Sequence, residues 1–308
     1  MSKLDAVQMQ LLREVADLHE IPEGAYNLRS NGESAGRRST EHIEIVSKSE
    51  GSGIDIHIKP GTKNESVHIP VVLSQSGLKE TVYNDFYIGE DCDVLIVAGC
   101  GIDNCGKQDS QHDGIHRFFI GKGSHIRYVE KHYGSGDGAG KRILNPVTEI
   151  YMEEDSSAEL EMVQIKGVDS TKRTTLAQLK ANAKLIVRER LMTHGEQTSE
   201  SIYRVELNGD GSSADVVSRS VARDTSYQKL DACIIGNAAC SGHTECDSII
   251  MDKGRILAVP SLEANSVDAA LVHEAAIGKI AGDQLIKLMT LGLTEAEAEE
   301  QIIGGFLK

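Results

Sequence analysis

The stretch IYRVELNGDGSSADV (residues 202–216) places a polar turn between two short segments of alternating character. Val205 and Leu207 alternate with charged residues before the turn, and Ala214 and Val216 flank an aspartate after it. A repeat of two residues is typical of a β-strand that buries one face. The Asn, Gly, Asp and Ser residues between the segments are the usual formers of tight turns. The stretch therefore predicts two strands joined by a turn.

The same alternation continues from about Ile43 to Val259. Strands are expected to start near positions 158, 173, 183, 201, 215, 230 and 247, roughly 10–18 residues apart, with no helix-length segment between them. This spacing fits either a β-sandwich or a β-helix, in which coils stack around layers of Val, Ile and Leu. Aromatic residues make up only 4% of the 308 residues and Trp is absent, which favours the β-helix.

Helices are expected at both ends of the chain. Apolar residues recur every three or four positions from Leu4 to Leu18, which predicts a helix ended by Pro22 and Gly24. Residues 29–41 are polar and rich in Gly and Ser, so we expect a loop or linker there.

The chain is expected to be helical from about residue 266, beginning with residues 269–272. Asp283 can cap a helix that Gly292 ends, and residues 294–297 form a capping box for the last helix. The expected parts are an N-terminal helix and linker (1–42), a β core (43–260) and a C-terminal helical region (261–308).

Composition excludes several classes of function. The chain carries 32 basic and 47 acidic residues, a formal charge of −15, which argues against binding to nucleic acid or to a membrane surface. It has no apolar run of ~18 residues, and its start, MSKLDAVQMQ, resembles no signal peptide. We therefore expect a cytoplasmic protein, and we interpret the six cysteines as thiols or metal ligands.

Familiar catalytic motifs are absent from the sequence. Gly136 to Lys141 resembles a phosphate loop but has one residue too few and lacks the hydroxyl after the lysine. His273 and Glu274 begin like a zinc-protease motif, but Ile277 replaces the second histidine, and no GxSxG element occurs. We therefore expect that the chain is not an enzyme and binds no nucleotide.

Two clusters carry metal-ligand chemistry. The first has the spacing Cys-x4-Cys-x6-His-x3-His and consists of Cys100, Cys105, His112 and His116. Thiolates and imidazoles suit a soft or borderline metal, and the even separation of the two histidines places both on one face of a strand. The alternative is that the cysteines are small core residues and the histidines lie at a turn.

The second cluster holds three cysteines and a histidine within fourteen residues: Cys233, Cys240, His243 and Cys246. A thiol beside a histidine can become a thiolate, the form that binds metals. Cys233 alternates with isoleucines, which indicates a core residue. Cys240 follows a Gly/Asn/Ala turn, so we expect it to be accessible.

The C-terminal string HEAAIGKIAGDQLIKLMTLGLTEAEAEEQIIGGF (residues 273–306) resembles the terminal signature of the SufB/SufD family of iron–sulfur cluster assembly proteins. The resemblance extends upstream through Cys240-x-x-His243-Thr and the Cys233-Ile-Ile-Gly segment, and more weakly to Cys100. It covers about residues 95–306 and is strongest over the last 80.

The resemblance implies a right-handed parallel β-helix with helical ends. It implies a scaffold subunit that holds a transient iron–sulfur cluster, and a SufC-like ABC ATPase that docks on the C-terminal helices. Cys240 matches the family's cluster cysteine, and His273 and Glu274 match its imidazole and acid pair; His243 lies beside them. The sulfur donor and the recipient proteins are not identified by the sequence.

The chain is shorter than the usual scaffold subunits and lacks most of their N-terminal helical region. Residues 158–207 contain no cysteine, where larger subunits carry one that receives sulfur. We therefore expect a simplified system in which a homodimer replaces a heterodimer, with Cys240 of each copy serving one of two symmetric sites. Two alternatives remain: a structural or regulatory partner of the ATPase without its own cluster, and a metal-binding protein centred on the Cys100 cluster.

Overall fold

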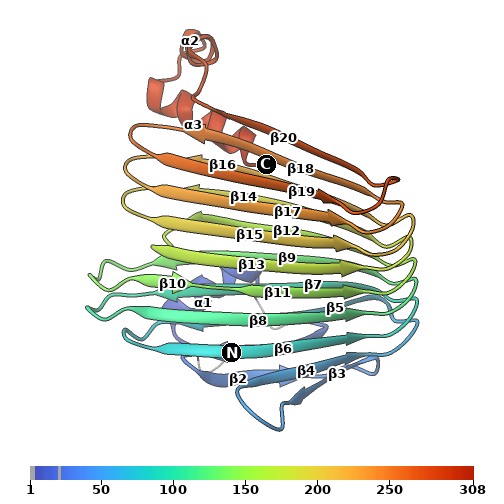
Figure 1. The fold of residues 1–308 in the computed structure, drawn as a ribbon. Coiled ribbons are helices and arrows are strands. Elements are labelled where there is room, and N and C mark those ends of the chain that lie inside the picture. Colours follow the sequence, from blue (N-terminus) through green and yellow to red (C-terminus); the bar gives the residue numbers. More distant parts are fainter. Residues whose placement is uncertain (1–3, 20–21) are drawn as a thin grey trace.

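The computed structural model describes residues 4–19 and 22–308 and is a parallel β-solenoid (Figure 1). The chain passes alternately through two sheets, so that each coil contributes a strand to both. About eight coils stack on one another. The predicted β-helix is confirmed, and the β-sandwich is excluded.

Neighbouring strands run parallel within each sheet, apart from the antiparallel pairs β1–β2 and β3–β4 at the start of the chain. Sheet A contains β2 (Glu33–Arg38), β1 (Ala25–Ser30), β5 (Lys63–Leu73), β7 (Asp93–Asp103), β9 (His125–Ser135), β12 (Ser157–Lys166), β14 (Lys184–Thr193), β16 (Ser213–Ala222), β18 (Ser241–Ile250) and β20 (Ala270–Gly278). Sheet B contains β3 (Ile43–Ser47), β4 (Gly53–Ile58), β6 (Lys79–Ile88), β8 (Ser110–Ile120), β10 (Arg142–Leu144), β11 (Val147–Met152), β13 (Ser170–Leu179), β15 (Thr198–Leu207), β17 (Tyr227–Gly236) and β19 (Arg255–Ala264).

Equivalent turns stack along one side of the solenoid. The position two residues before five successive strands of sheet A, β7 to β16, has a positive φ, and it is occupied by Asp91, Gly123, Asp155, Asn182 and Gly211. Gly, Asn and Asp are the residues that tolerate this left-handed conformation best. Because this turn recurs from coil to coil, Gly, Asn and Asp residues recur in the sequence at intervals of about one coil.

The N-terminal helix α1 (Ala6–Ala16) is confirmed, although it ends before Pro22, at a left-handed Asp17. It lies on the outer face of sheet A, where Leu11 and Val15 pack against Gly99 and Gly101 of β7. A side chain at Gly99 would come within 2.3 Å of the Val15 carbonyl oxygen, so the close approach requires glycine. The prediction of a loop at residues 29–41 is wrong, because β2 pairs with β1, which in turn pairs with β5.

The C-terminal region is helical only from Gly282. The predicted helical start at residues 269–272 is wrong, because Ala270–Gly278 pairs with β18 as strand β20. Helix α2 (Gly282–Thr290) protrudes from the end of the solenoid, and α3 (Glu295–Phe306) folds back onto it (Figure 1). Thr294 and Glu297 form the predicted capping box, whereas Asp283 lies in the first turn of α2 and Ala281 is its N-cap.

Helix α3 is fixed by apolar contacts. Ile303 and Leu307 pack with Val221 of β16 in a small cluster on the outer face of sheet A. By contrast, α2 buries none of its side chains, and Ile286 is 60% exposed. Within the part of the chain that the structure describes, no helix is long and apolar enough to cross a membrane.

Candidate functional site at the open end of the solenoid

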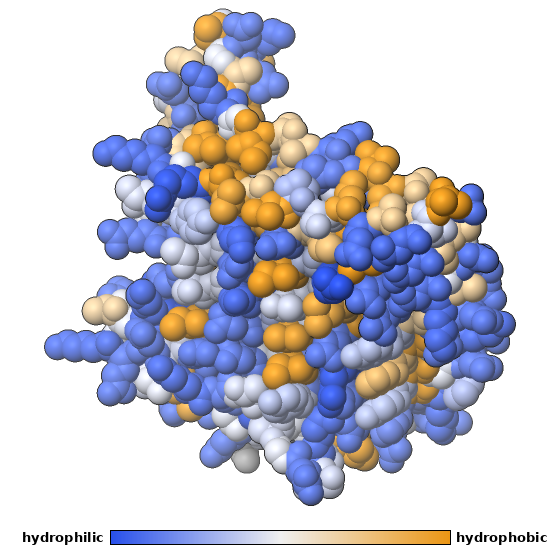
Figure 2. Space-filling view, viewed as in Figure 1, coloured by the Kyte–Doolittle hydropathy of each residue, from blue (hydrophilic) through white to orange (hydrophobic). Residues whose placement is uncertain are grey.

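The last coil of the solenoid is uncovered in the chain. β19 and β20 are the terminal strands of sheets B and A, and each has a strand neighbour on one side only within the described residues. Large apolar side chains are exposed on these two strands: Leu257, Val259, Leu262, Val272 and Ile277. Figure 2 shows hydrophobic residues gathered on the upper part of the molecule, beside the protruding C-terminal segment. An open, apolar edge of a sheet is suited to pairing with another chain.

Cys240 lies in the turn between β17 and β18, one coil below this edge. Its side chain is only 6% exposed and belongs to the main hydrophobic core. The space beside its sulfur is narrow, since a Cβ placed on Gly236 would lie 3.0 Å from Cys240 Sγ. The expectation that Cys240 is accessible is therefore wrong for the single chain, because the last coil covers it.

His273 and Glu274 lie on β20 and, as consecutive strand residues, face opposite sides of sheet A. His273 faces the interior, where its Nδ1 is 2.6 Å from Thr244 Oγ1 and its buried Nε2 has no hydrogen-bond partner. Glu274 is exposed on the outer face beside Glu245. Because the two side chains point to opposite faces of the sheet, they can contribute to one site only across the free edge of the strand, and β20 is the terminal strand of sheet A.

Cys240 and His273 are not in contact within one chain. Ser241 pairs with Ala270, so Cys240 is level with residue 269 and four positions away from His273. At a rise of ~3.3 Å per residue, the two residues are separated by about 13 Å along the strand direction.

His243 is placed on the outer face of sheet A, away from Cys240. Its Nδ1 is 2.8 Å from Asp215 Oδ1, and Arg188 donates to the other oxygen of Asp215 at 2.7 Å. Burial disfavours the Asp215 carboxylate, but the hydrogen bonds from His243 and Arg188 outweigh it and lower its pKa. A carboxylate that binds one ring nitrogen orients the other, as is common for metal-ligating histidines. The ring lines a polar groove of about 360 Å³ with Glu245.

The first predicted cluster is only partly assembled. Cys100 on β7 and both His112 and His116 on β8 point into the solenoid and are 6%, 2% and 3% exposed. The prediction that the two histidines share one face is confirmed. Cys105 lies instead in an exposed loop, with its Sγ 3.3 Å from Asp103 Oδ2. Across residues 4–19 and 22–308, no three His, Cys, Asp or Glu side chains are arranged to hold a metal ion.

A buried ionic network in the solenoid interior was missed by the sequence analysis. Arg173 of β13 forms an ion pair with Glu130 of β9, and its Nε is 3.8 Å from Glu189 of β14. The exposures of these three side chains do not exceed 4%. Burial disfavours the Glu130 carboxylate, but Arg173 and then His132 outweigh it and hold its pKa well below the usual value. Part of the interior is therefore polar and charged.

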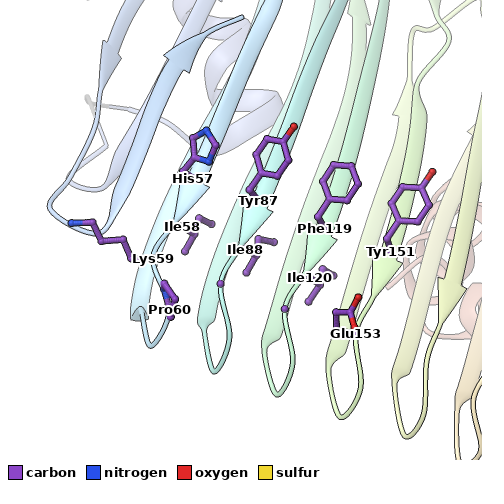
Figure 3. A pocket seen from close by; sticks show the side chains of 12 residues that line it. His57, Ile58, Lys59, Pro60, Tyr87, Ile88, Phe119, Ile120, Tyr151 and Glu153 are labelled. Atoms are coloured by element: carbon purple, nitrogen blue, oxygen red, sulfur yellow. The ribbon is translucent and has the colours of Figure 1, made fainter.

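A shallow hollow lies on the outer face of sheet B, several coils away from Cys240. His57, Tyr87, Phe119 and Tyr151 stack there in successive coils, with ring centroids 4.9, 5.2 and 5.2 Å apart (Figure 3). The hollow has a volume of about 530 Å³. None of the predicted site residues lines it.

The family model described as "SUF system FeS cluster assembly, SufBD core domain" matches residues 85–306, which include the Cys240 region, β20 and both C-terminal helices. Several curated relatives carry the name "Iron-sulfur cluster assembly SufBD family protein". The relative from Methanothermobacter thermautotrophicus is 28% identical over 262 residues, which are 84% of this chain and 63% of the relative. The one from Archaeoglobus fulgidus is 29% identical over 273 residues, 87% of this chain and 71% of the relative.

A third relative, from Methanocaldococcus jannaschii, is 27% identical over 274 residues, and the match covers 85% of its length. The chain thus spans a little under two thirds of the longer Methanothermobacter relatives that it matches. Because the family model covers most of the solenoid and the helical end, the chain belongs to the SufBD family.

Proposed function

We propose that this protein is a scaffold subunit on which an iron–sulfur cluster is assembled and from which it is passed on. Membership of the SufBD family supports a role in cluster assembly. The observation that carries the proposal is the placement of Cys240, His273 and Glu274 on the last two coils, next to the open end of the solenoid. In this role the chain is a carrier and not an enzyme, and it acts in the cytoplasm.

The nascent cluster is bound near Cys240, His273 and Glu274, with His243 nearby. Iron in clusters is held best by thiolates, so a mixed set of thiolate, imidazole and carboxylate binds the cluster less firmly than four cysteines. A weaker set suits a cluster that must leave for a recipient protein. The unpartnered Nε2 of His273 supports a role as a ligand, because buried polar atoms are normally satisfied.

Two copies of the chain complete the site. Cys240 and His273 are about 13 Å apart along the strand direction in one copy, which supports a site that takes the cysteine from one copy and His273 and Glu274 from the other. A twofold axis at the open end would create two such sites and bury the exposed Val272 and Ile277. Burial at the interface would also shield the cluster from water and oxidants.

A separate ABC ATPase of the SufC type supplies the nucleotide chemistry and docks on the C-terminal helices. Helix α2 supports this assignment, because it protrudes and leaves Ile286 and Leu291 60% and 80% exposed. The glycine-rich residues 136–140 lead into strand β10 and not into a helix, so this loop lacks the helix N-terminus of a phosphate loop. The sulfur donor and the recipients are further proteins.

One observation favours a second function. Cys240 is 6% exposed and packed in the core, as expected for a structural or regulatory partner of the ATPase that holds no cluster itself. The metal-binding alternative centred on Cys100, Cys105, His112 and His116 gains no support from the geometry, since Cys105 faces away from the other three.

Anaerobic reconstitution with iron and sulfide separates the two functions. The scaffold function predicts a visible charge-transfer band in the wild type that weakens in Cys240→Ser and Glu274→Gln. Cys233→Ser is the matched control, because Cys233 faces outward on β17 and is only partly buried, so its prediction as a core residue is wrong. An unchanged band in both test variants would refute the site, and a chain that binds the ATPase but no iron would favour the second function.

A further inference from the structure

Thr244 lies directly beneath His273 in the interior of the solenoid. The two residues are register partners on β18 and β20, and Thr244 Oγ1 is 2.6 Å from His273 Nδ1. Thr244 is 2% exposed, so the contact is shielded from water. Among the residues that the structure describes, its hydroxyl has no other hydrogen-bond partner. The contact thus ties an imidazole of the proposed cluster site to the coil below it.

Packing alone does not require a hydroxyl at this position. The same column of sheet A holds Leu160, Val187 and Val216 in the three preceding coils, and all three are buried and apolar. Valine branches at Cβ as threonine does, so it would fill the same space. A buried hydroxyl is costly unless it is hydrogen-bonded. The contact with His273 therefore accounts for the threonine in this column.

The contact determines which ring nitrogen of His273 is free. A neutral imidazole carries one proton, so one nitrogen donates and the other accepts. Within the described residues, the buried Nε2 has no hydrogen-bond partner, and a proton placed there would remain unsatisfied. A proton on Nδ1 is instead accepted by Thr244 Oγ1. The lone pair of Nε2 is then available to iron.

The contact also fixes the direction in which Nε2 points. The two ring nitrogens lie on different sides of an imidazole, so Nε2 faces away from the atom that Nδ1 binds. That atom belongs to β18, and β20 is the terminal strand of sheet A. Threonine is stiff at χ1, so its hydroxyl holds the ring in one orientation. Nε2 therefore points into the interior and away from β18, on the side of the last coil where no further strand of sheet A follows within the described residues.

We propose that Thr244 is a positioning residue of the cluster site: it accepts the Nδ1 proton of His273 and so presents Nε2 to iron. This inference rests on the proposed function, because His273 has a ligand to hold only if the chain binds a cluster. His273 touches the cluster, and Thr244 acts through His273. Partners that orient a metal-binding histidine in this way contribute about 10–100-fold to metal affinity.

Three variants separate the hydroxyl from its surroundings. Thr244→Val removes the hydroxyl and introduces the side chain that Val216 already has one coil below. Thr244→Ser keeps the hydroxyl. Thr175→Val is the matched control, because Thr175 is a fully buried threonine of β13 whose hydroxyl has no partner in the described part of the chain. Urea denaturation should show that all three variants remain folded.

The first measurement uses the full-length chain without a cluster and with ¹⁵N-labelled histidine. At about pH 8, above the ordinary imidazole pKa, long-range ¹H–¹⁵N spectra distinguish the protonated ring nitrogen from the unprotonated one. The signals of His273 are those that disappear in His273→Gln. We expect the proton on Nδ1 in the wild type and in Thr244→Ser, and a mixture of both forms or the Nε2–H form in Thr244→Val. The Nε2–H form in the wild type would overturn the proposal.

The second measurement is the retention of the cluster against an iron chelator after anaerobic reconstitution with iron and sulfide. Thr244→Val should lose its cluster at about one tenth of the chelator concentration that the wild type withstands, whereas Thr244→Ser and Thr175→Val should match the wild type. A cluster held as firmly by Thr244→Val would overturn this inference and leave the proposed function standing. A wild type that takes up no cluster would overturn both, so the two failures are distinguishable.

Discussion

Replacing Arg173 with Met removes the centre of the buried ionic network. The guanidinium is 4% exposed, pairs with Glu130, and lies 3.8 Å from Glu189. Methionine fills a similar volume without a charge. Glu189 keeps the hydroxyls of Ser201 and Ser218 at 2.6 and 2.7 Å, but Glu130 loses its guanidinium. The variant thus leaves a buried carboxylate without its main counter-charge.

Loss of one partner from a buried ion pair costs about 3–5 kcal/mol, because the remaining charge stays out of water. The matched control is Lys180→Met, which breaks a pair with Glu153 at 2.7 Å between side chains that are 58% and 50% exposed. A pair exposed to this extent contributes at most about 1 kcal/mol, since water and salt screen it. The two variants should therefore differ by at least ~2 kcal/mol.

Urea denaturation followed by circular dichroism measures both variants against the wild type. The pKa of Glu130 also determines how this stabilisation changes with pH. The pKa of Glu130 is lowered in the folded protein, so the stabilisation is present above its unfolded value of 4.5 and is lost as the pH falls through the folded value. The deficit of Arg173→Met should shrink in acid. Equal unfolding free energies for the two variants at neutral pH would refute the reasoning.

Three further variants test the surfaces. Val272→Asp should convert a dimer into a monomer in analytical ultracentrifugation, because it places a charge on the open edge. The control Leu176→Asp, on the outer face of sheet B, should leave the dimer intact. A monomeric wild type would contradict this prediction. Ile286→Asp should abolish co-purification with the ATPase without changing the circular dichroism; retained binding would exclude α2. Thr294→Ala should destabilise α3 by about 1 kcal/mol, seen as faster amide exchange confined to that helix.

The β-helix could be predicted because its turns and its alternation are local. Val205 and Leu207 alternate with charged residues, and Asn208 to Gly211 form the turn in sequence as in space. Two strands, β2 and β20, were missed. Residues 33–38 look like a linker, and residues 269–272 favour helix by composition, yet pairing with β1 and β18 overrides both local preferences.

The candidate site was predicted in residue type but not in arrangement. Cys240 is buried by packing of the following coil, which no local pattern reveals. Parity along the strand could have revealed the interior network: Arg173 and Thr175 have the same parity as Ala177 and Leu179, so all four face inward.

The central claim is that each cluster site takes Cys240 from one copy and His273 and Glu274 from the other. The most direct measurement co-expresses Cys240→Ser chains with His273→Gln/Glu274→Gln chains under different affinity tags, purifies the mixed dimer, and reconstitutes it anaerobically with iron and sulfide. One of the two sites in the mixed dimer is then intact, so we predict about half of the wild-type cluster content, while each pure variant dimer binds almost none. A mixed dimer as empty as the two pure variants would contradict the shared site.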